Sequence, residues 1–277
     1  MAQSPQIPAE ALLCGGGPPR PTRETLAAEA LLQIKINGAA WMTTVQTPGM
    51  EAALVRGLLL SEGVIAADTP VSLHTVNDPE SGWVACVEAA IPSAWLRKDI
   101  ADLRSNVASA SCGFCGVRSV EDLKLDGAAL LHTMEARYTP AQIAAMMDAL
   151  TQGQGLFQAT GGCHGAALFD ANATLLCLAE DIGRHNAVDK CIGALLLEKR
   201  IGAARCLVVS GRLSYEIVFK AVQARVPVVA AVSAPSSLAV DTARQYGITL
   251  LGFCRPPRST VYSHQHRIAA SVCAGES

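Results

Sequence analysis

Apolar and polar residues alternate along the first third of the chain in the manner of half-buried strands. Residues 31–36 and 41–46 follow this pattern, and Asn37-Gly38 between them predicts a hairpin turn, because both residue types tolerate positive φ. Leucines spaced on one face predict a helix over 51–63. Two further strands are predicted at 71–76 and 83–91. This part is therefore expected to be a small α+β unit.

The pattern changes after residue 139, where short apolar runs alternate with longer segments of helical spacing. Thr139-Pro140 is a helix start signal, and a helix is expected over 141–150. Strands are then predicted at 166–169, 175–178, 206–209, 226–232 and 248–251, and helices at 186–199, 214–224 and 236–246. Such alternation predicts right-handed crossovers and a layered α/β domain, whose ligands gather at the carboxyl ends of the strands. Those ends lie near Ser210, Ser233 and Gly252.

Four regions are expected from this organisation. Residues 1–22 contain a glycine and proline run and are interpreted as a flexible tail, followed by a small α+β domain at 23–104. Residues 105–137 have small side chains and little periodicity, which predicts a mobile loop region. Residues 138–277 are predicted to form the α/β ligand-binding domain.

Composition narrows the class of protein. The chain has 277 residues, half of them hydrophobic, and a formal net charge of −2, so no general basic field is available to hold nucleic acid. Many of its 10 cysteines lie inside apolar runs, as reduced core residues do. Neither a signal peptide nor a membrane-length apolar run is evident, so a cytoplasmic location is expected.

The most reactive pair in the sequence is Cys112 and Cys115, two residues apart and each followed by glycine. A thiolate is a nucleophile in sulfur chemistry, and a neighbouring cysteine can resolve or share its sulfur. The pair therefore suggests a sulfur carrier or a redox couple. Half of a structural zinc site is the alternative, although a zinc site needs two more ligands than this pair supplies.

Polar groups beside the predicted strand ends suggest an anion site. His164 follows a glycine-rich approach to a strand and could donate to an anion, or could be satisfied by a backbone carbonyl. Arg184 and His185 lie at the start of a predicted helix, where free N–H groups attract anions. The alternative there is a capping network, with Asn186 as N-cap and Asp189 as its partner.

Two further segments add cations at the same strand ends. Arg212 follows a buried strand and is placed to contact a phosphate or a guanine edge, unless it is an ordinary solvated arginine. The second segment, residues 253–258, contains an aromatic ring on which a base could stack and two arginines on either side of a rigid proline pair. The alternative interpretation of this segment is a surface turn. Its residues are Phe253, Cys254, Arg255, Pro256, Pro257 and Arg258.

The order of these motifs resembles one known family. Cys-Gly-Phe-Cys-Gly, Thr-Gly-Gly-Cys-His-Gly, Gly-Arg-His-Asn-Ala-Val-Asp-Lys, Ser-Gly-Arg-Leu-Ser-Tyr-Glu and Gly-Phe-Cys-Arg-Pro-Pro-Arg follow one another along the chain. This series is similar to the FdhD family of sulfur carrier proteins that activate formate dehydrogenases. The resemblance extends from about residue 24 to about residue 267.

The resemblance implies a sulfurtransferase that forms a persulfide. Such a protein accepts sulfur from a cysteine desulfurase and transfers it to molybdenum or tungsten held by two pterin guanine dinucleotides. The recipient is the catalytic subunit of formate dehydrogenase. Cys112 would carry the sulfur, with Cys115 as its partner, and residues 253–258 would match the cofactor-binding stretch of the family.

The family also implies several properties of the whole protein. Guanosine diphosphate should mimic the cofactor, and the protein should be a cytoplasmic homodimer that binds neither nucleic acid nor membrane. A cytidine-deaminase-like fold is implied for the C-terminal domain. The zinc signature of true deaminases is absent from the sequence, so deaminase chemistry is not expected. No metal-binding residues are predicted.

Three other hypotheses about the function stay open at this point. A non-catalytic chaperone for the molybdenum cofactor would need the nucleotide site but not Cys112. A zinc-stabilised binding module would use Cys112 and Cys115 with His164 or His185. A thiol oxidoreductase is disfavoured, because the cysteine pair does not follow a strand at a helix start.

Overall fold

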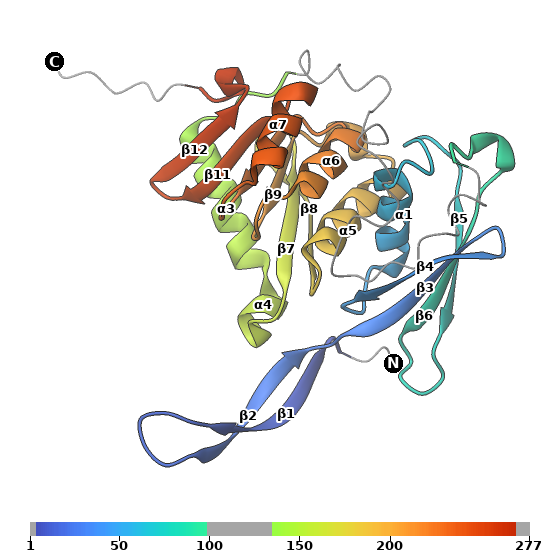
Figure 1. Ribbon diagram of the computed structural model, residues 1–277, viewed down its shortest axis with the longest axis vertical. Coiled ribbons are helices and arrows are strands. Elements are labelled where there is room, and N and C mark those ends of the chain that lie inside the picture. The colour runs from blue at the N-terminus through green and yellow to red at the C-terminus, as the bar shows by residue number, and fades with distance from the viewer. Residues whose placement is uncertain (1–3, 99–134, 270–277) are drawn as a thin grey trace.

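The computed structural model describes residues 4–98 and 135–269, and these form three β-sheets with helices packed between and beside them (Figure 1). The mixed α/β class predicted from the sequence is confirmed. The likeness of the C-terminal part to cytidine deaminases and the domain boundaries stay predictions. In the described ranges, no helix combines the length and apolar character needed to cross a membrane.

The smaller sheet has four strands in the order β4-β3-β6-β5. Its strands are β3 (Ala30–Ile36), β4 (Ala39–Gln46), β5 (Ser72–Asn77) and β6 (Val84–Ala90). The predicted hairpin turn between β3 and β4 is confirmed, since Asn37 and Gly38 both have positive φ. Helix α1 (Glu51–Ser61) follows β4 and is buried on all sides from Ala53 onward.

The larger sheet has six strands in the order β12-β11-β10-β9-β7-β8. Its strands are β7 (His164–Phe169), β8 (Leu175–Asp181), β9 (Cys206–Val209), β10 (Val228–Ala231), β11 (Thr249–Arg255) and β12 (Arg258–Ser263). Strands β9, β10 and β11 are parallel, whereas β7, β8 and β12 are antiparallel to their neighbours. The predicted crossovers are therefore present in the centre of this sheet, and β12 is a strand that the apolar pattern did not predict.

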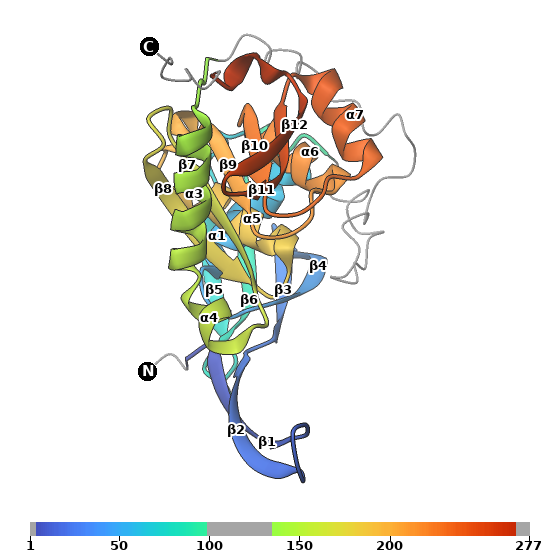
Figure 2. The same ribbon diagram turned by 90° about the vertical axis from the view of Figure 1, so that its left-hand side faces the viewer.

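Helices cover both faces of the larger sheet (Figure 2). Residues facing one side, such as Leu207 and Val209, join a core that includes the apolar residues of α1. Residues facing the other side, such as Cys206 and Val208, pack against the helix that begins at Pro140. The helices are α3 (Pro140–Gly153), α4 (Gly155–Thr160), α5 (Arg184–Leu197), α6 (Tyr215–Gln223) and α7 (Ser237–Tyr246).

The small and large sheets are joined through a very close crossing of α1 and α5. A Cβ added at Gly193 of α5 would lie 1.7 Å from the carbonyl oxygen of Ala53. A Cβ added at Gly57 of α1 would lie 2.0 Å from the carbonyl oxygen of Asp189. Only glycine lets the two backbones approach this closely. The crossing thus fixes α5, whose first turn belongs to the site described below.

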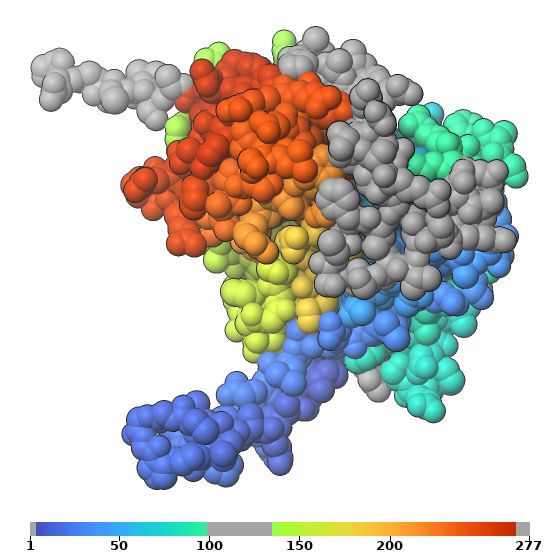
Figure 3. All heavy atoms as spheres, in the orientation of Figure 1, coloured from blue at the N-terminus to red at the C-terminus, as the bar shows by residue number. Residues whose placement is uncertain are grey.

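Residues near the N-terminus form a hairpin rather than the predicted tail. Strand β1 (Gln6–Leu13) pairs in antiparallel fashion with β2 (Arg20–Ala27), and the glycine and proline run forms the connection between them. The hairpin extends away from the body of the molecule (Figure 3). The tail prediction was wrong because the run of turn residues was taken as a sign of disorder, whereas it connects two pairing strands.

Candidate functional site

One edge of the larger sheet collects the polar residues that the sequence singled out. The parallel strands β9, β10 and β11 end there, and β7 begins there because it is antiparallel to β9. Ser210 donates its backbone N–H to Gly165, and Phe253 donates its own to Ser233. Helices α5, α6 and α7 all begin at this edge. Their free N–H groups give the edge a positive potential.

His164, Arg184 and Gly211 lie against one another at this edge. A Cβ added at Gly211 would be 3.5 Å from His164 Nδ1 and 3.6 Å from Arg184 Cδ. Arg184 is the first residue of α5, and its Nε is buried without a hydrogen-bond partner among the described residues. A buried guanidinium nitrogen without a partner is costly, and an anionic ligand would satisfy it.

His185 is held by a carboxylate from the neighbouring helix α6. Its Nε2 lies 2.7 Å from Glu216 Oε2, and Ser214 Oγ donates to the same oxygen over 3.0 Å. The interaction with His185 lowers the pKa of Glu216, which is therefore ionised at neutral pH. The contact with Glu216 fixes the imidazole beside Arg184. Glu216 was not among the candidate residues predicted from the sequence, although the Ser-x-Glu spacing places it in the same helical turn as Ser214.

The cationic group consists of His164, Arg184, His185 and Arg212. Arg212 lies in the loop that precedes α6. It is exposed, and its charge contributes to lowering the pKa of His164. This loop is tied to the next one, because Leu213 donates to the Ala234 carbonyl and Ser236 donates to the Leu213 carbonyl. His164, Arg184, His185 and Arg212 are therefore brought together, as four neighbouring donors at the strand ends.

The pKa shift of His164 predicts how stability depends on pH. Burial is the main cause of the lowered pKa, followed by the charges of Arg184 and His185. As pH falls through about 6.5, the unfolded chain takes up a proton at this imidazole that the folded protein does not, so stability falls. We expect His164→Gln to lose less stability than the wild type between pH 7 and pH 5 in urea titrations. Equal losses in the two proteins would contradict this.

The segment at residues 253–258 has a different position from the cationic group. It forms the end of β11 and the turn into β12, and the peptide bond between Pro256 and Pro257 is cis. Phe253 is 49% exposed and has a φ of 52°, an unusual conformation for a bulky residue and one often kept for function. Arg255 and Arg258 are paired across the turn and exposed.

The proline turn packs against α3, on the opposite face of the sheet from α5. The cavity between them has a volume of about 20 Å³, room for little more than one water molecule, so it is not a nucleotide pocket. Cys254 is buried, and burial raises the pKa of its thiol to about 11. Cys254 is thus a core residue, while Phe253, Arg255 and Arg258 are exposed to solvent.

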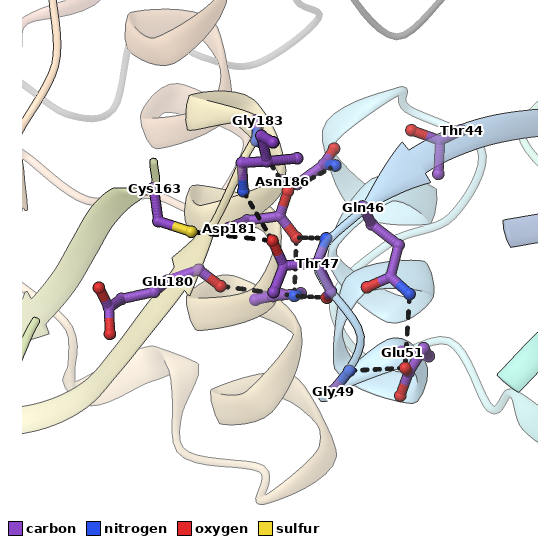
Figure 4. A network of polar contacts seen from close by, with 12 residues as sticks. Thr44, Gln46, Thr47, Gly49, Glu51, Cys163, Glu180, Asp181, Gly183 and Asn186 are labelled. Atoms are coloured by element: carbon purple, nitrogen blue, oxygen red, sulfur yellow. Dashed lines mark hydrogen bonds and ion pairs between the residues drawn. The ribbon is translucent and has the colours of Figure 1, made fainter. Parts of the chain in front are cut away.

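A buried network beside the edge explains the rest of the long polar run. Asp181 Oδ2 accepts the backbone N–H of Thr47 over 3.1 Å (Figure 4). The same oxygen lies 2.7 Å from Lys190 Nζ. Lys190 also donates to the Thr47 carbonyl over 2.7 Å. Asp181 and Lys190 thus hold the loop between β4 and α1 in place, and their side chains are not available to a ligand.

Asn186 and Asp189 do not cap α5, contrary to the alternative considered from the sequence. The helix begins two residues before Asn186, with Gly183 at the N-cap. Asn186 Nδ2 donates to the Val45 carbonyl and to Asp181 instead. Asp189 accepts from Ser61 of α1 and from Lys220 of α6. Both partners are distant in sequence, so local pattern reasoning had no signal for them.

The two cysteines expected to carry sulfur, Cys112 and Cys115, lie outside the described residues. Their assignment as catalytic residues stays a prediction. The same holds for the assignment of the cationic group and of residues 253–258 to a cofactor, since the geometry described above identifies donors and not the molecule they bind.

Comparison with known proteins identifies relatives over most of the chain. Residues 27–269 match the model of the FdhD/NarQ family. A protein of Streptomyces avermitilis named "Sulfur carrier protein FdhD" is 41% identical over 261 residues, which cover 91% of this chain and 92% of that protein. A protein of the same name from Nocardia farcinica is 41% identical over 260 residues, covering 91% of each chain.

A solved structure has a similar fold. It is the crystal structure of a putative formate dehydrogenase accessory protein from Desulfotalea psychrophila, and it superposes with a TM-score of 0.77 at 21% sequence identity. The superposition covers 96% of this chain and 100% of the other. At this identity the likeness supports the fold alone.

Proposed function

This chain belongs to the FdhD/NarQ family, and from that premise we propose that it is a sulfurtransferase serving formate dehydrogenase. It takes persulfide sulfur from a cysteine desulfurase and transfers it to the bis-molybdopterin guanine dinucleotide, which is its substrate. The relatives named as sulfur carrier proteins support this reading. We also propose that it acts in the cytoplasm as a homodimer, a form that suits a substrate with two nucleotides.

The observation that carries the proposal is the cationic group at the strand ends. Arg184, His185 and Arg212 stand beside the first turns of α5 and α6, and the buried Arg184 Nε has no hydrogen-bond partner in residues 4–98 and 135–269. A diphosphate matches this arrangement, because it can accept from guanidinium groups and from helix N-termini at once. We assign the diphosphate of one guanine dinucleotide to these residues.

The exposed side chains at the β11–β12 turn suit the remaining parts of the substrate. Phe253 offers a ring on which a guanine can stack, and Arg255 and Arg258 supply two further cations. Phe253 of the turn donates its backbone N–H to the Ser233 carbonyl, and the loop of Arg212 is bonded to the next residue, because Leu213 donates to the Ala234 carbonyl. We therefore expect one extended substrate to use both regions.

The sulfur step is assigned to the cysteine pair. The Cys112 thiolate attacks the outer sulfur of the desulfurase persulfide, which forms a Cys112 persulfide and releases the desulfurase thiolate. Cys115 can receive the outer sulfur by the same exchange, with the Cys112 thiolate as leaving group. No net proton is taken up or released, because one thiolate is consumed and one is formed at each step.

Mass spectrometry of the intact protein tests the carrier role. After incubation with a cysteine desulfurase and cysteine, the wild type should gain about 32 Da per sulfur, and reductant should remove the gain. Cys112→Ala should lose the gain, whereas loss only in Cys115→Ala would reverse the assignment of the two residues. No gain in any form, with guanosine diphosphate still bound, would leave a cofactor chaperone and exclude sulfur transfer.

Calorimetry with guanosine diphosphate tests the assigned diphosphate site. Arg212→Ala removes one charge-assisted contact, so we expect the dissociation constant to rise about 10- to 100-fold. Arg200→Ala is the matched control, because Arg200 is an exposed arginine beyond the other end of α5. Equal affinity of Arg212→Ala and Arg200→Ala would remove Arg212 from the site.

A further inference from the structure

Two cysteines outside the proposed site face each other between β8 and α5. Cys177 lies on β8, which is an edge strand of the larger sheet, and it is partly exposed. It pairs with Leu168 across the β7–β8 ladder. Directly opposed residues point to the same face of a sheet, and Leu168 belongs to the core on the α5 side. Cys177 therefore faces α5.

Cys191 approaches the same spot from the helix. It is fully buried in α5, and its thiol donates to the Ala166 carbonyl over 3.1 Å. Ala166 precedes Leu168 by two residues on β7, so the Cys191 sulfur lies one ladder step from Cys177. Both thiols are free. The register of the sheet and the position of the helix thus place two reduced sulfurs side by side.

The two thiols have different properties. Hydrogen bonding with Cys191 is the main cause of a lowered pKa at Cys177, and the charge of Arg200 acts in the same direction. Burial raises the pKa of Cys191. The partly exposed Cys177 thiol is consequently the better nucleophile toward a dissolved reagent, and the buried Cys191 thiol is placed to react only with its neighbour.

We propose that Cys177 and Cys191 form a dithiol that a low-molecular-weight disulfide, such as oxidised glutathione, converts into an intramolecular disulfide. The Cys177 thiolate attacks the glutathione disulfide, which gives a mixed disulfide and one glutathione thiolate. Cys191 then loses its proton to water and attacks the Cys177 sulfur, which releases the second glutathione thiolate. The two cysteines are oxidised by two electrons, and the glutathione disulfide is reduced by two.

Other cysteines of the described part provide contrasts. Cys206 and Cys254 are both buried, and burial raises the pKa of each, so neither should react with a dissolved disulfide. Cys14 is exposed at the end of the β1–β2 hairpin and should accept glutathione as a mixed disulfide. Cys14 is therefore an internal control for the reagent.

The experiment uses the full chain carrying Cys112→Ser and Cys115→Ser, which removes the thiols of the proposed sulfur site. After treatment with oxidised glutathione, blocking with iodoacetamide and digestion, we expect a cross-linked peptide joining Cys177 to Cys191, with a loss of about 2 Da. In Cys191→Ala, Cys177 should instead retain glutathione, a gain of about 305 Da. In Cys177→Ala, Cys191 should carry no glutathione and should be recovered with the iodoacetamide block of a free thiol.

Two results would overturn the proposal. One is stable glutathione on Cys177 while Cys191 is present, because the buried thiol would then not resolve the mixed disulfide. The other is glutathione on Cys14 while Cys177 and Cys191 both carry the iodoacetamide block, because the two cysteines would then have stayed free thiols in the presence of an active reagent. The cross-link is measured in a chain that keeps both cysteines, so a folding defect of either alanine variant cannot produce or hide the result.

Discussion

Gly193→Ala is expected to lower the free energy of unfolding by roughly 3 kcal/mol, the upper end of the usual cost of overpacking. The added methyl would lie 1.7 Å from the Ala53 carbonyl oxygen and 2.7 Å from the Gly57 nitrogen. All of these partners are backbone atoms, so no rotamer change relieves the overlap and α1 must move away from α5. The higher helix propensity of alanine offsets only about 1 kcal/mol.

Urea titration and thermal unfolding would measure this effect. Gly155→Ala is the matched control, since Gly155 is also helical and a Cβ there meets no atom of the described residues within 4 Å. We expect the control to stay within about 1 kcal/mol of the wild type. Similar stability of Gly193→Ala and Gly155→Ala would mean that α1 and α5 can separate without loss.

Lys190→Met is expected to destabilise the protein by about 3–5 kcal/mol, because it leaves a buried carboxylate without its cation. Lys190 is 1% exposed and Asp181 is fully buried, and their charged atoms lie 2.7 Å apart. The Thr47 carbonyl would also lose the donor that it has at 2.7 Å. The loop between β4 and α1 would then lose part of its attachment to the larger sheet.

The double variant Asp181→Asn with Lys190→Met separates the charge effect from the packing effect. If the unpaired carboxylate causes most of the loss, the double variant should be more stable than Lys190→Met alone in the same urea titrations. If the double variant instead loses as much stability as the two single variants together, relative to the wild type, the two groups act independently.

The fold was largely predictable from local patterns. Alternation identified β3 and β4, and the Asn37-Gly38 turn between them is dictated by two residues that accept positive φ. Thr139 caps α3 as expected, with Gln142 closing the capping box. The parallel strands β9 to β11 follow from buried runs separated by helices. In each case the deciding residues are neighbours in sequence.

The site was predictable only in part. His164, Arg184, His185 and Arg212 were expected near strand ends, and the antiparallel direction of β7 brings the first of them to the same edge as the others. The contact of His185 with the Glu216 carboxylate was not foreseen, since it joins two helices. Contacts between distant segments depend on how the elements pack, and one sequence carries no direct signal for them.

The contact between α1 and α5 also has a consequence during protein synthesis. The Thr47 loop and α1 leave the ribosome before the residues that cover them, since Thr47 is separated from Asp181 by 134 positions and from Lys190 by 143. At about 5–20 residues per second, the delay is roughly 7–29 s. During this time α1, which is buried on nearly all sides in the finished protein, lacks α5, the helix that crosses it most closely. We therefore expect the nascent chain to depend on holding chaperones in this interval, and a stalled chain that ends before α5 to aggregate.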